Sequence, residues 1–376
     1  MSTRTVPFIN LGAQYRSIRD EIRQALDRVI DSTSFILGEE VERFEKNFAE
    51  YLGAKHCVAL NSGTSALHLA LVALDIKKGD EVITTPYSFI APAEAISYTG
   101  ARPVFVDIDA ESFNLDVSRI RGAITKRTRA IMPVHLYGLP VDMAELMKIA
   151  GEFDLPVIED AAQAHGAECS VEGAWRKVGT IGDMGCFSFY PTKNLGACGE
   201  GGAVVTDNQR LFEKIRMLRN HGQTGQQYHH QFIGYNYRMT AFQGAVLGVK
   251  LKRLDEWIEA RRSRAALYDG GLKDTQLKTP KRAENSKGVY HQYVVRAKDR
   301  DGLRKFLEER GIETGIYYPL SIPLQDAYRH MGHQEGDFPA SEMCAKECLS
   351  LPMYPELEES DVEYVCSKIM DWAKKE

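Results

Sequence analysis

The feature that most constrains the fold is an alternation of short apolar runs with helical patterns through the first two thirds of the chain. The apolar runs lack the polar alternation of a strand with one wet face, so each is expected to be buried on both sides. This order predicts an α/β fold with a mostly parallel sheet covered by helices. The runs are CVALN (57–61), DEVITT (80–85), RPVFVDID (102–109), RAIMPVHLYG (129–138) and LPVIEDAA (155–162).

The length of the chain, 376 residues, exceeds what one hydrophobic core usually organises, so two domains that share a cleft are expected. Residues 239–268 have the pattern of one long helix or two, and the patterns beyond them indicate a smaller α+β unit. We predict a large domain over residues 1–245 and a small C-terminal domain over residues 246–376.

Composition and charge argue against several kinds of partner. The net charge is −5 and no run of lysine or arginine stands out, so neither nucleic acid nor an anionic membrane surface is expected as a partner. No stretch stays apolar for about 18 residues and the start lacks a signal peptide pattern, which favours a cytoplasmic protein. Seven cysteines without a CxxC motif indicate reduced thiols, and no metal site is predicted.

A single lysine stands in the segment SFYPTKNLGACGEGG (188–202), which is otherwise small, hydroxylated or rich in glycine. The apolar run MGCFSFY (184–190) precedes it and is expected to be a buried strand. Lys193 therefore follows a strand end and precedes a glycine-rich turn that can approach a ligand closely. Burial there would lower its pKa and make it a Schiff-base nucleophile, although a lysine is more commonly an ordinary surface residue.

Two further segments place polar groups at the ends of predicted strands. In NSGTSALHLA (61–70) a strand leads through Ser-Gly-Thr-Ser into a helix, so free amides of the first helical turn could bind phosphate. In IEDAAQAHG (158–166), Asp160 or Glu159 would need a cation such as a protonated pyridine nitrogen, and Gln163 could hold a ring hydroxyl. Ordinary helix capping and an internal ion pair are the structural alternatives.

Aromatic and hydroxyl groups complete the pattern. Tyr87 and Phe89 follow another strand in TPYSFIAPA (85–93), where an aromatic ring either stacks on a flat ligand or fills the core. Ser188 offers a hydroxyl in the segment of the lysine. A phosphate cup, an acid for a ring nitrogen, a stacking aromatic and an aldehyde-reactive lysine together specify pyridoxal 5'-phosphate.

Motifs along almost the whole chain then carry a family resemblance. The chain resembles the DegT/DnrJ/EryC1/StrS family of sugar aminotransferases, within the type I (aspartate aminotransferase) fold of pyridoxal-phosphate enzymes. The motifs are FINLGAQY, FILGEEVERFEKNFAEYLG, NSGTSALHLAL, VFVDID, VIEDAAQAHGA, FSFYPTKNLGACGEGGAVVT, RNHGQ, GYNYRMT, GIYYP, GDFPASE and LSLPMYPEL.

The resemblance implies roles for individual residues. Lys193 would form the Schiff base and move the proton, Asp160 would pair with the pyridine nitrogen, and Gln163 would lie near the phenolic oxygen of the ring. Asn236 would reach the phosphate of the other subunit, so a homodimer with shared active sites is expected. Phe89 would stack on the ring. The expected phosphate contacts are Gly63, Thr64, Ser65 and Ser188, and the expected substrate contacts are Tyr318, Tyr190 and His165.

The implied reaction moves an amino group from L-glutamate to a nucleotide-linked keto-hexose, with a 3-keto sugar slightly favoured over a 4-keto sugar. Two departures bear on the substrate and on nearby packing. Pro323 in YYPLSIPLQ (317–325) stands where many relatives have histidine, and RMTAFQGAVLG (238–248) carries Ala241, Phe242 and Gly244 in a segment that usually reads RMTELQAAI.

Three other functions fit the sequence less well. The dehydratase branch of the family has histidine in place of the lysine, so Lys193 argues against it. A regulatory protein without cofactor would be expected to lose Lys193, Asp160 or the phosphate cup, and all are present. A nicotinamide-dependent dehydrogenase would need a GxGxxG motif after the first strand, and this chain has none there.

Overall fold

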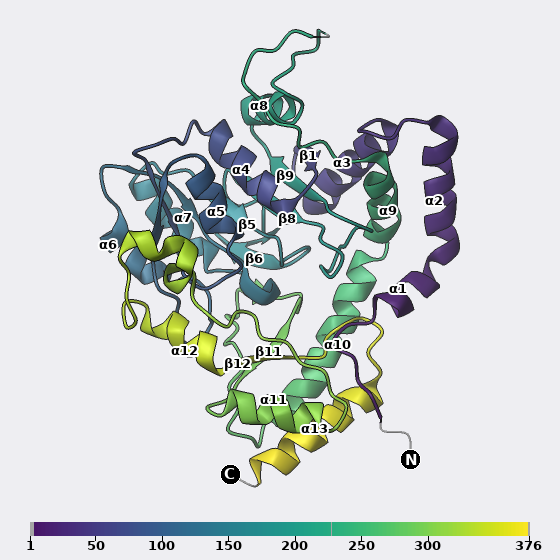
Figure 1. Cartoon of the computed structure of the whole chain (residues 1–376), viewed down its shortest axis with the longest axis vertical. Coiled ribbons are helices and arrows are strands. Elements are labelled where there is room, and N and C mark those ends of the chain that lie inside the picture. Colours follow the sequence, from purple (N-terminus) through teal and green to yellow (C-terminus); the bar gives the residue numbers. More distant parts are fainter. Residues whose placement is uncertain (1–3, 227, 375–376) are drawn as a thin grey trace.

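The central sheet is built from a three-stranded and a four-stranded segment in the computed structural model, which describes residues 4–226 and 228–374 (Figure 1). Parallel bridges from Ile131 to Val157 and from Val134 to Asp160 join the two segments. The strands lie in the order β3 (Arg102–Phe105), β2 (Glu81–Thr84), β4 (Thr128–Met132), β5 (Ile158–Asp160), β8 (Met184–Ser188), β9 (Gly202–Thr206) and β1 (His56–Leu60).

Most neighbouring strands of this sheet run parallel. The pairs β2–β3, β2–β4 and β5–β8 are parallel, whereas β9 runs antiparallel to both β8 and β1. The expected α/β fold with a mostly parallel sheet is therefore confirmed, with β9 as a reversed strand.

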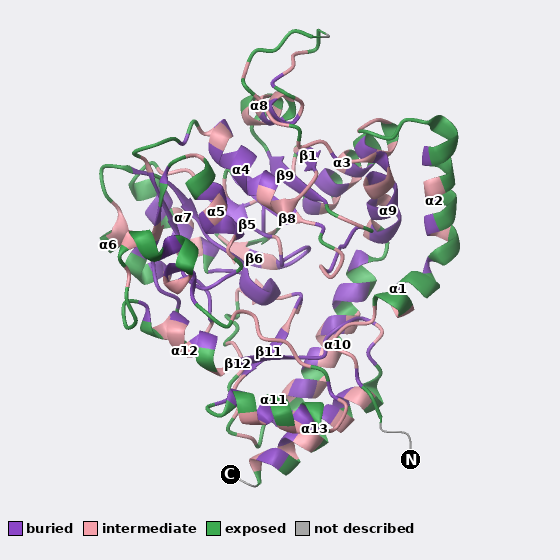
Figure 2. Cartoon of the chain, in the orientation of Figure 1, coloured by how far each residue is buried: buried purple, intermediate pink, exposed green. Residues whose placement is uncertain are grey.

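Alternate residues of the strands enter two separate hydrophobic clusters, as the two-residue period of a strand requires. One face packs against α3 (Glu39–Leu52) and α7 (Met143–Glu152), and the other against α4 (Gly63–Ala73), α5 (Ala91–Tyr98) and α8 (Gln209–Arg219). Phe187 of β8 lies on the first face, and its neighbour Cys186 on the second. The strands are consequently buried from both sides (Figure 2).

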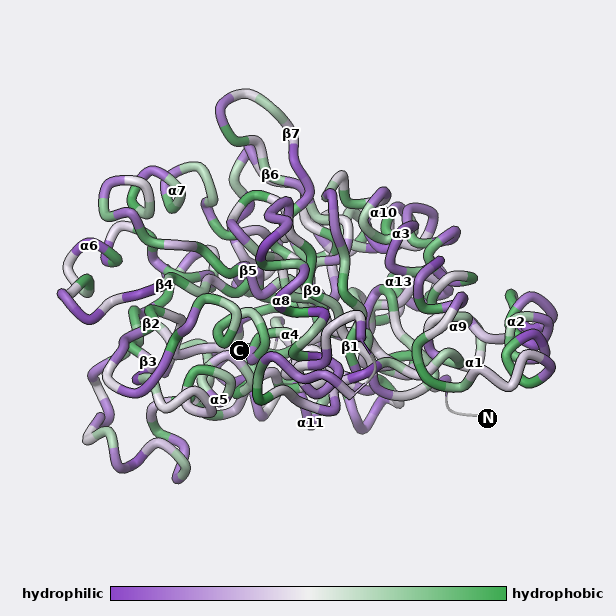
Figure 3. Tube along the Cα trace, turned by 90° about the horizontal axis from the view of Figure 1, so that it is seen from above, coloured by the Kyte–Doolittle hydropathy of each residue, from purple (hydrophilic) through white to green (hydrophobic). Residues whose placement is uncertain are grey.

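Other elements surround the large α/β part. Helix α2 (Arg19–Ser32) packs against α9 (Ala241–Leu251) through a cluster of its own. The view from above shows α1, α2 and α9 at the end of the molecule opposite β3, β2 and β4 (Figure 3). The remaining elements of this part are α1 (Leu11–Ser17), η1 (Val117–Arg119), α6 (Ile120–Ala123), η2 (Leu136–Gly138), β6 (Glu168–Val171) and β7 (Ala174–Lys177).

The C-terminal part has its own hydrophobic cluster around an antiparallel pair of strands, β11 (Tyr293–Arg296) and β12 (Cys348–Leu351). Val6 joins this cluster from the other end of the chain and bridges to Ile312. The boundary at residue 245 falls within α9 and stays a prediction. The remaining elements are α10 (Leu254–Leu272), β10 (Ser286–Lys287), α11 (Arg300–Glu308), η3 (Ile322–Leu324), η4 (Asp326–Met331), α12 (Pro339–Glu347) and α13 (Glu359–Ala373).

A segment of the C-terminal part returns to the large part and is fastened there. The carboxylate of Asp107, beyond β3, accepts hydrogen bonds from the amides of Ala340 and Ser341 at 3.0 and 3.1 Å. The amide of Ile322 donates to the carbonyl oxygen of Pro86 at 2.8 Å. These contacts hold the segment that carries Tyr317 and Tyr318 against the ends of β2 and β3. Within the described ranges, no helix combines the length and apolar character needed to cross a membrane.

Candidate active site

The loop that carries Lys193 leaves β8 and folds back on itself. The amide of Ala197 donates to the carbonyl oxygen of Phe189 at 2.8 Å, and the buried ammonium of Lys250 donates to the carbonyl oxygen of Gly196 at 2.7 Å. A Cβ atom at Gly196 would lie 2.3 Å from the carbonyl oxygen of Pro191, so this turn requires glycine. The glycine-rich sequence therefore closes a tight loop that presents Lys193.

Lys193 has the environment that its sequence context predicted. Protein surrounds its ammonium group, although part of the side chain keeps accessible surface. Burial lowers the pKa of Lys193 to about 8, against the opposing attraction of the Asp160 carboxylate. A larger fraction of this lysine than of an exposed one is consequently a neutral amine near neutral pH, and the neutral amine is the form that attacks a carbonyl carbon.

The two carboxylates at the end of β5 lie on opposite faces of the sheet. Glu159 is fully buried and accepts hydrogen bonds from the amides of Gly179, Ile181 and Gly182 at 2.7–2.8 Å. His135 adds a fourth, from Nε2 at 3.0 Å, because its Nδ1 accepts from the amide of Val141. Burial alone would raise the pKa of Glu159, but His135 and these amides hold it below its usual range.

Asp160 lies on the other face and is less well supplied with donors. It is 5% exposed, and its carboxylate accepts a hydrogen bond from the amide of Ala162 at 3.0 Å. Burial raises the pKa of Asp160, and the Ala162 amide and the charge of Lys193 offset only part of that rise. A cation placed against this carboxylate would be strongly favoured. The sequence allowed either Glu159 or Asp160 to pair with a cationic ligand, and Asp160 is the one whose carboxylate is still short of hydrogen-bond donors.

The start of α4 and the end of β8 meet at a corner on this same face. A Cβ atom at Gly63 would lie 2.6 Å from the Cβ atom of Ser188, so only glycine allows this approach. Ser62 caps the helix by accepting from the amide of Ser65 at 3.1 Å, and the Ser65 hydroxyl donates to Asn61 at 2.7 Å. Ordinary capping is thus observed here, alongside a helix N-terminus suited to an anion.

A polar and aromatic wall lies beside Asp160. The side-chain oxygen of Gln163 accepts from the amide of Tyr137 at 2.7 Å, and its nitrogen donates to the hydroxyl of Tyr318 at 3.2 Å. The ring of Phe89 lies 6.1 Å from that of Tyr318 and is 55% exposed. An apolar ring left this exposed at a strand end can stack on a flat ligand.

The other predicted residues are placed differently. Tyr190 is 49% exposed beside the lysine loop, whereas His165 is completely buried with its ring against Phe187 and Phe189. A direct contact between substrate and His165 would require this packing to change, and its role stays a prediction. Thr64 is half-buried in the first turn of α4.

Asn236 lies apart from this group. It is exposed and bridges to Asn220, next to a segment after α8 that projects from the molecule (Figure 1). That segment exposes 83% of Tyr228 and 96% of Ile233. The predicted role of Asn236 in a second subunit therefore stays a prediction.

Sequence reasoning missed Tyr137, whose amide holds Gln163 and whose hydroxyl reaches the backbone of Tyr317. The available signal was the Tyr-Gly pair that ends the run RAIMPVHLYG (129–138), since a glycine within a strand pattern suggests an irregular backbone or a close backbone approach. No group of three or more histidine, cysteine, aspartate or glutamate side chains suited to a metal ion occurs in residues 4–226 and 228–374.

The residues present fit pyridoxal phosphate. Asp160 lacks a cation that a protonated ring nitrogen would supply, Phe89 offers an apolar face, and Lys193 has the lowered pKa of an aldehyde-reactive amine. The amino end of α4, closed against Ser188, suits a phosphate.

The chain is similar to known proteins along almost its whole length. Residues 16–370 match the model of the DegT/DnrJ/EryC1/StrS aminotransferase family. A pleiotropic regulatory protein of Geobacillus stearothermophilus is 45% identical over 98% of each chain. A UDP-N-acetyl-3-dehydro-alpha-D-glucosamine 3-aminotransferase of Acidithiobacillus ferrooxidans is 42% identical over 97% of each chain.

A solved structure is equally similar. The S. venezuelae protein DesV, determined in complex with a ketimine intermediate, superposes with a TM-score of 0.96 at 44% identity over 99% of both chains. Similarity of this extent covers both parts of the molecule and the whole of the site. The chain thus belongs to the DegT/DnrJ/EryC1/StrS aminotransferase family and is a transaminase that depends on pyridoxal phosphate.

Proposed function

We propose that this protein transfers the amino group of L-glutamate to a nucleotide-linked 3-keto-hexose. The observation that carries the proposal is the pairing of Lys193, with its pKa lowered to about 8, and the under-supplied carboxylate Asp160 on one face of β5. The name of the Acidithiobacillus ferrooxidans relative, which specifies a 3-dehydro sugar, supports the 3-keto position over the 4-keto position.

The bound cofactor supplies an aldehyde for the amino group and a ring that accepts electrons. In the proposed mechanism Lys193 would hold the aldehyde carbon until the amine of the donor takes its place, and its freed amine would then serve as a base. Its Nζ would take the proton from the α-carbon of the donor and deliver it to the former aldehyde carbon, which the donor nitrogen separates from the α-carbon, a contribution on the order of 10² to 10⁴ in rate. Asp160 keeps the ring nitrogen protonated, and Gln163 orients the ring through its phenolic oxygen.

Binding of the cofactor falls to the residues around this pair. Phe89 covers one face of the ring, and Gly63, Thr64, Ser65 and Ser188 hold the phosphate at the start of α4. Asn236 is assigned to the phosphate of a second subunit, which makes the protein a homodimer with shared sites. The exposed segment beside Asn236, with Tyr228 and Ile233, supports contact with a second copy.

The substrate assignment is tested with nitrogen-15 L-glutamate and pairs of nucleotide sugars that differ only in the position of the ketone. We expect label at carbon 3 of the 3-keto sugar and at least tenfold slower amination of its 4-keto isomer, read by NMR of the product. Faster amination of the 4-keto sugar would contradict the proposed position. An unlabelled product sugar would contradict glutamate as the donor.

A regulatory role is the second candidate, favoured by the name of the Geobacillus stearothermophilus relative. It predicts a protein in which Lys193→Ala retains its biological effect, because regulation through binding does not need the amine. Loss of that effect in Lys193→Ala, together with loss of amination, would favour the enzyme.

A further inference from the structure

A hydrogen-bonded group of tyrosines joins the candidate site to the C-terminal part of the chain. Tyr87 follows β2 and Tyr137 lies in η2, and their side chains are 1% and 4% exposed. The Tyr87 hydroxyl donates to the carbonyl oxygen of Tyr317 at 3.0 Å and accepts from the amide of Tyr318 at 3.2 Å. Both polar groups of the peptide between Tyr317 and Tyr318 are thus bound by one phenol.

The second phenol reinforces the first. The Tyr137 hydroxyl reaches the same carbonyl oxygen of Tyr317 and lies 3.1 Å from the Tyr87 hydroxyl. Each phenol has a single proton to donate. When the Tyr87 hydroxyl donates to the carbonyl oxygen of Tyr317, the Tyr137 hydroxyl donates either to the same oxygen or to the Tyr87 hydroxyl. Burial raises the pKa of both phenols, which keeps them protonated donors at neutral pH.

The backbone of Tyr137 closes a ring of contacts. Its amide donates to the side-chain oxygen of Gln163 at 2.7 Å, and the nitrogen of Gln163 donates to the Tyr318 hydroxyl at 3.2 Å. Gln163 is therefore held at both ends of its amide group. Tyr137 binds its oxygen, and Tyr318, whose backbone amide is bound by Tyr87, binds its nitrogen.

The conformation of Tyr137 is unusual for a residue with a side chain. Its φ is 58°, in the left-handed region, and Gly138 follows with φ 87°. A Cβ atom at Gly138 would lie 2.8 Å from Val289 Cγ2 and 3.0 Å from the carbonyl oxygen of Gln163. Strain of this kind persists where surrounding contacts over-determine the backbone, often at functional sites. Here it directs the amide of Tyr137 to Gln163.

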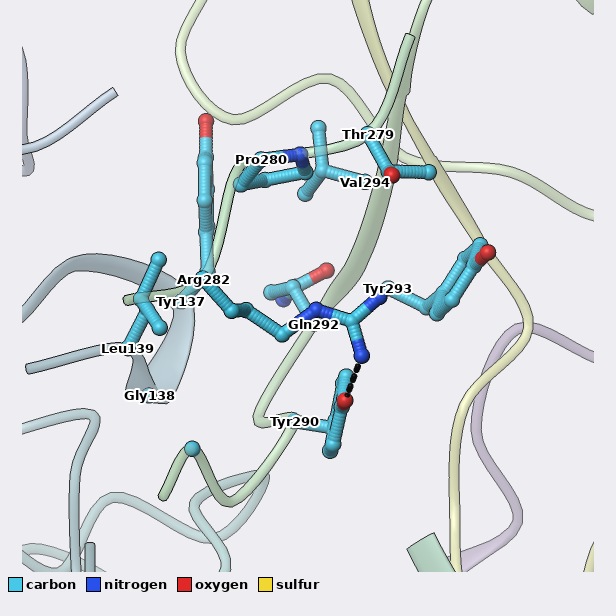
Figure 4. A pocket seen from close by; sticks show the side chains of 11 residues that line it. Tyr137, Gly138, Leu139, Thr279, Pro280, Arg282, Tyr290, Gln292, Tyr293 and Val294 are labelled. Atoms are coloured by element: carbon cyan, nitrogen blue, oxygen red, sulfur yellow. Dashed lines mark hydrogen bonds between the residues drawn. The ribbon is translucent and has the colours of Figure 1, made fainter. Parts of the chain in front are cut away.

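A small cavity lies beside Tyr137, and Gln163, Tyr87 and Tyr318 are not among the residues that line it (Figure 4). Its volume is about 30 Å³, room for roughly two water molecules. Arg282 crosses it to the hydroxyl of Tyr290 and pairs with Asp269 at 2.7 Å. The guanidinium is thus already engaged, and the cavity offers no room for a substrate. The amide and the hydroxyl of Tyr137 bind Gln163 and the backbone of Tyr317, and its carbonyl oxygen accepts from the amide of Gln292 at 3.3 Å.

We propose that Tyr87 and Tyr137 are positioning residues that lock Tyr318 against Gln163 and so fix the orientation of the Gln163 amide toward the cofactor. The proposal rests on the proposed contact of Gln163 with the cofactor ring. The lock also spans the two parts of the chain, since Tyr87, Tyr137 and Gln163 belong to the large part and Tyr318 to the C-terminal segment.

The first test measures amide hydrogen exchange of Tyr318 in the apoprotein. Because this amide donates to the Tyr87 hydroxyl, Tyr87→Phe should accelerate its exchange by roughly tenfold or more. Tyr268→Phe is the matched control: Tyr268 is completely buried, and its hydroxyl donates to the carbonyl oxygen of Pro352 at 3.0 Å. Exchange at Tyr318 unchanged in Tyr87→Phe would overturn the lock.

The second test measures the effect on the cofactor in two separate variants, Tyr87→Phe and Tyr137→Phe. Each should weaken pyridoxal phosphate binding by roughly three- to tenfold and shift the pH midpoint of its visible absorption. Tyr268→Phe should change neither. Wild-type affinity and midpoint in both variants, or equal changes in Tyr268→Phe, would overturn the positioning role. The proposed function is tested separately: it fails if Lys193→Ala, mixed with pyridoxal phosphate, shows the same visible absorption band as the wild type.

Discussion

Glu159 and Asp160 are adjacent in sequence and both buried, yet the two faces of β5 treat them in opposite ways. On the α3 and α7 face, Glu159 has three backbone amides and His135 as donors, and its pKa is lowered. On the α4 and α5 face, Asp160 has the Ala162 amide and the nearby charge of Lys193, and its pKa is raised. A carboxylate with saturated contacts stabilises the fold, whereas one short of donors is prepared for a ligand.

The strongest way to sharpen this comparison is to neutralise Asp160. Asp160→Asn should lower kcat/KM by about 10² to 10³, because it removes the charge that keeps the ring nitrogen protonated. The free energy of unfolding of the apoprotein should change by less than about 1 kcal/mol, since few contacts are lost. Steady-state kinetics and urea unfolding measure the two effects. Full activity in Asp160→Asn would remove this residue from the mechanism.

The same substitution at the neighbouring residue should do the reverse. Glu159→Gln should lower the free energy of unfolding by about 3 kcal/mol, because its amide group cannot accept from every donor that now surrounds the carboxylate. The stabilisation from Glu159 is present above its unfolded pKa of about 4.3 and is lost as the pH falls through its lower folded value. The difference between wild type and Glu159→Gln should therefore shrink in urea titrations below pH 4. A constant difference from pH 7 to pH 2 would contradict the ionised state assigned to Glu159.

Replacing Lys193 should change the free energy of unfolding by less than replacing Glu159 does, and with the opposite sign. Its folded pKa, about 8, lies below its unfolded value, so the unfolded chain binds more protons between the two. The penalty is complete below pH 8 and disappears as the pH rises to about 10.4. Apoprotein carrying Lys193→Met should be more stable than wild type by about 2 kcal/mol at pH 7, with little difference near pH 10.5. A destabilised variant at pH 7 would show that Lys193 is held by contacts like those of Glu159.

Local sequence pattern was sufficient to predict the strands of the central sheet other than β9, together with the candidate residues at their ends. The apolar runs predicted the sheet, and the run ending at Asp160 and the glycine-rich turn after Lys193 predicted their burial at one edge. The two-residue period places Glu159 and Asp160 on opposite faces, but it does not tell which face carries the site. Which face carries the site depends on the helices that cover each face of the sheet.

Contacts between distant segments were outside the reach of such patterns. The Tyr137 hydroxyl meets a carbonyl 180 residues further along the chain, and nothing local to either segment specifies that pairing. The reversed strand β9 and the docking of residues 317–347 on Asp107 depend equally on long-range packing. The residues of the candidate site were thus predictable from local pattern, whereas the distant contacts of Tyr87 and Tyr137 were not.

The central claim is that Lys193, on the open face of β5, forms the link to the cofactor. The most direct measurement is the visible absorption of wild type and Lys193→Ala after reconstitution with pyridoxal phosphate, before and after addition of L-glutamate. We predict a band in the wild type that glutamate bleaches and that Lys193→Ala never forms. The same band, with the same response to glutamate, in Lys193→Ala would contradict the account.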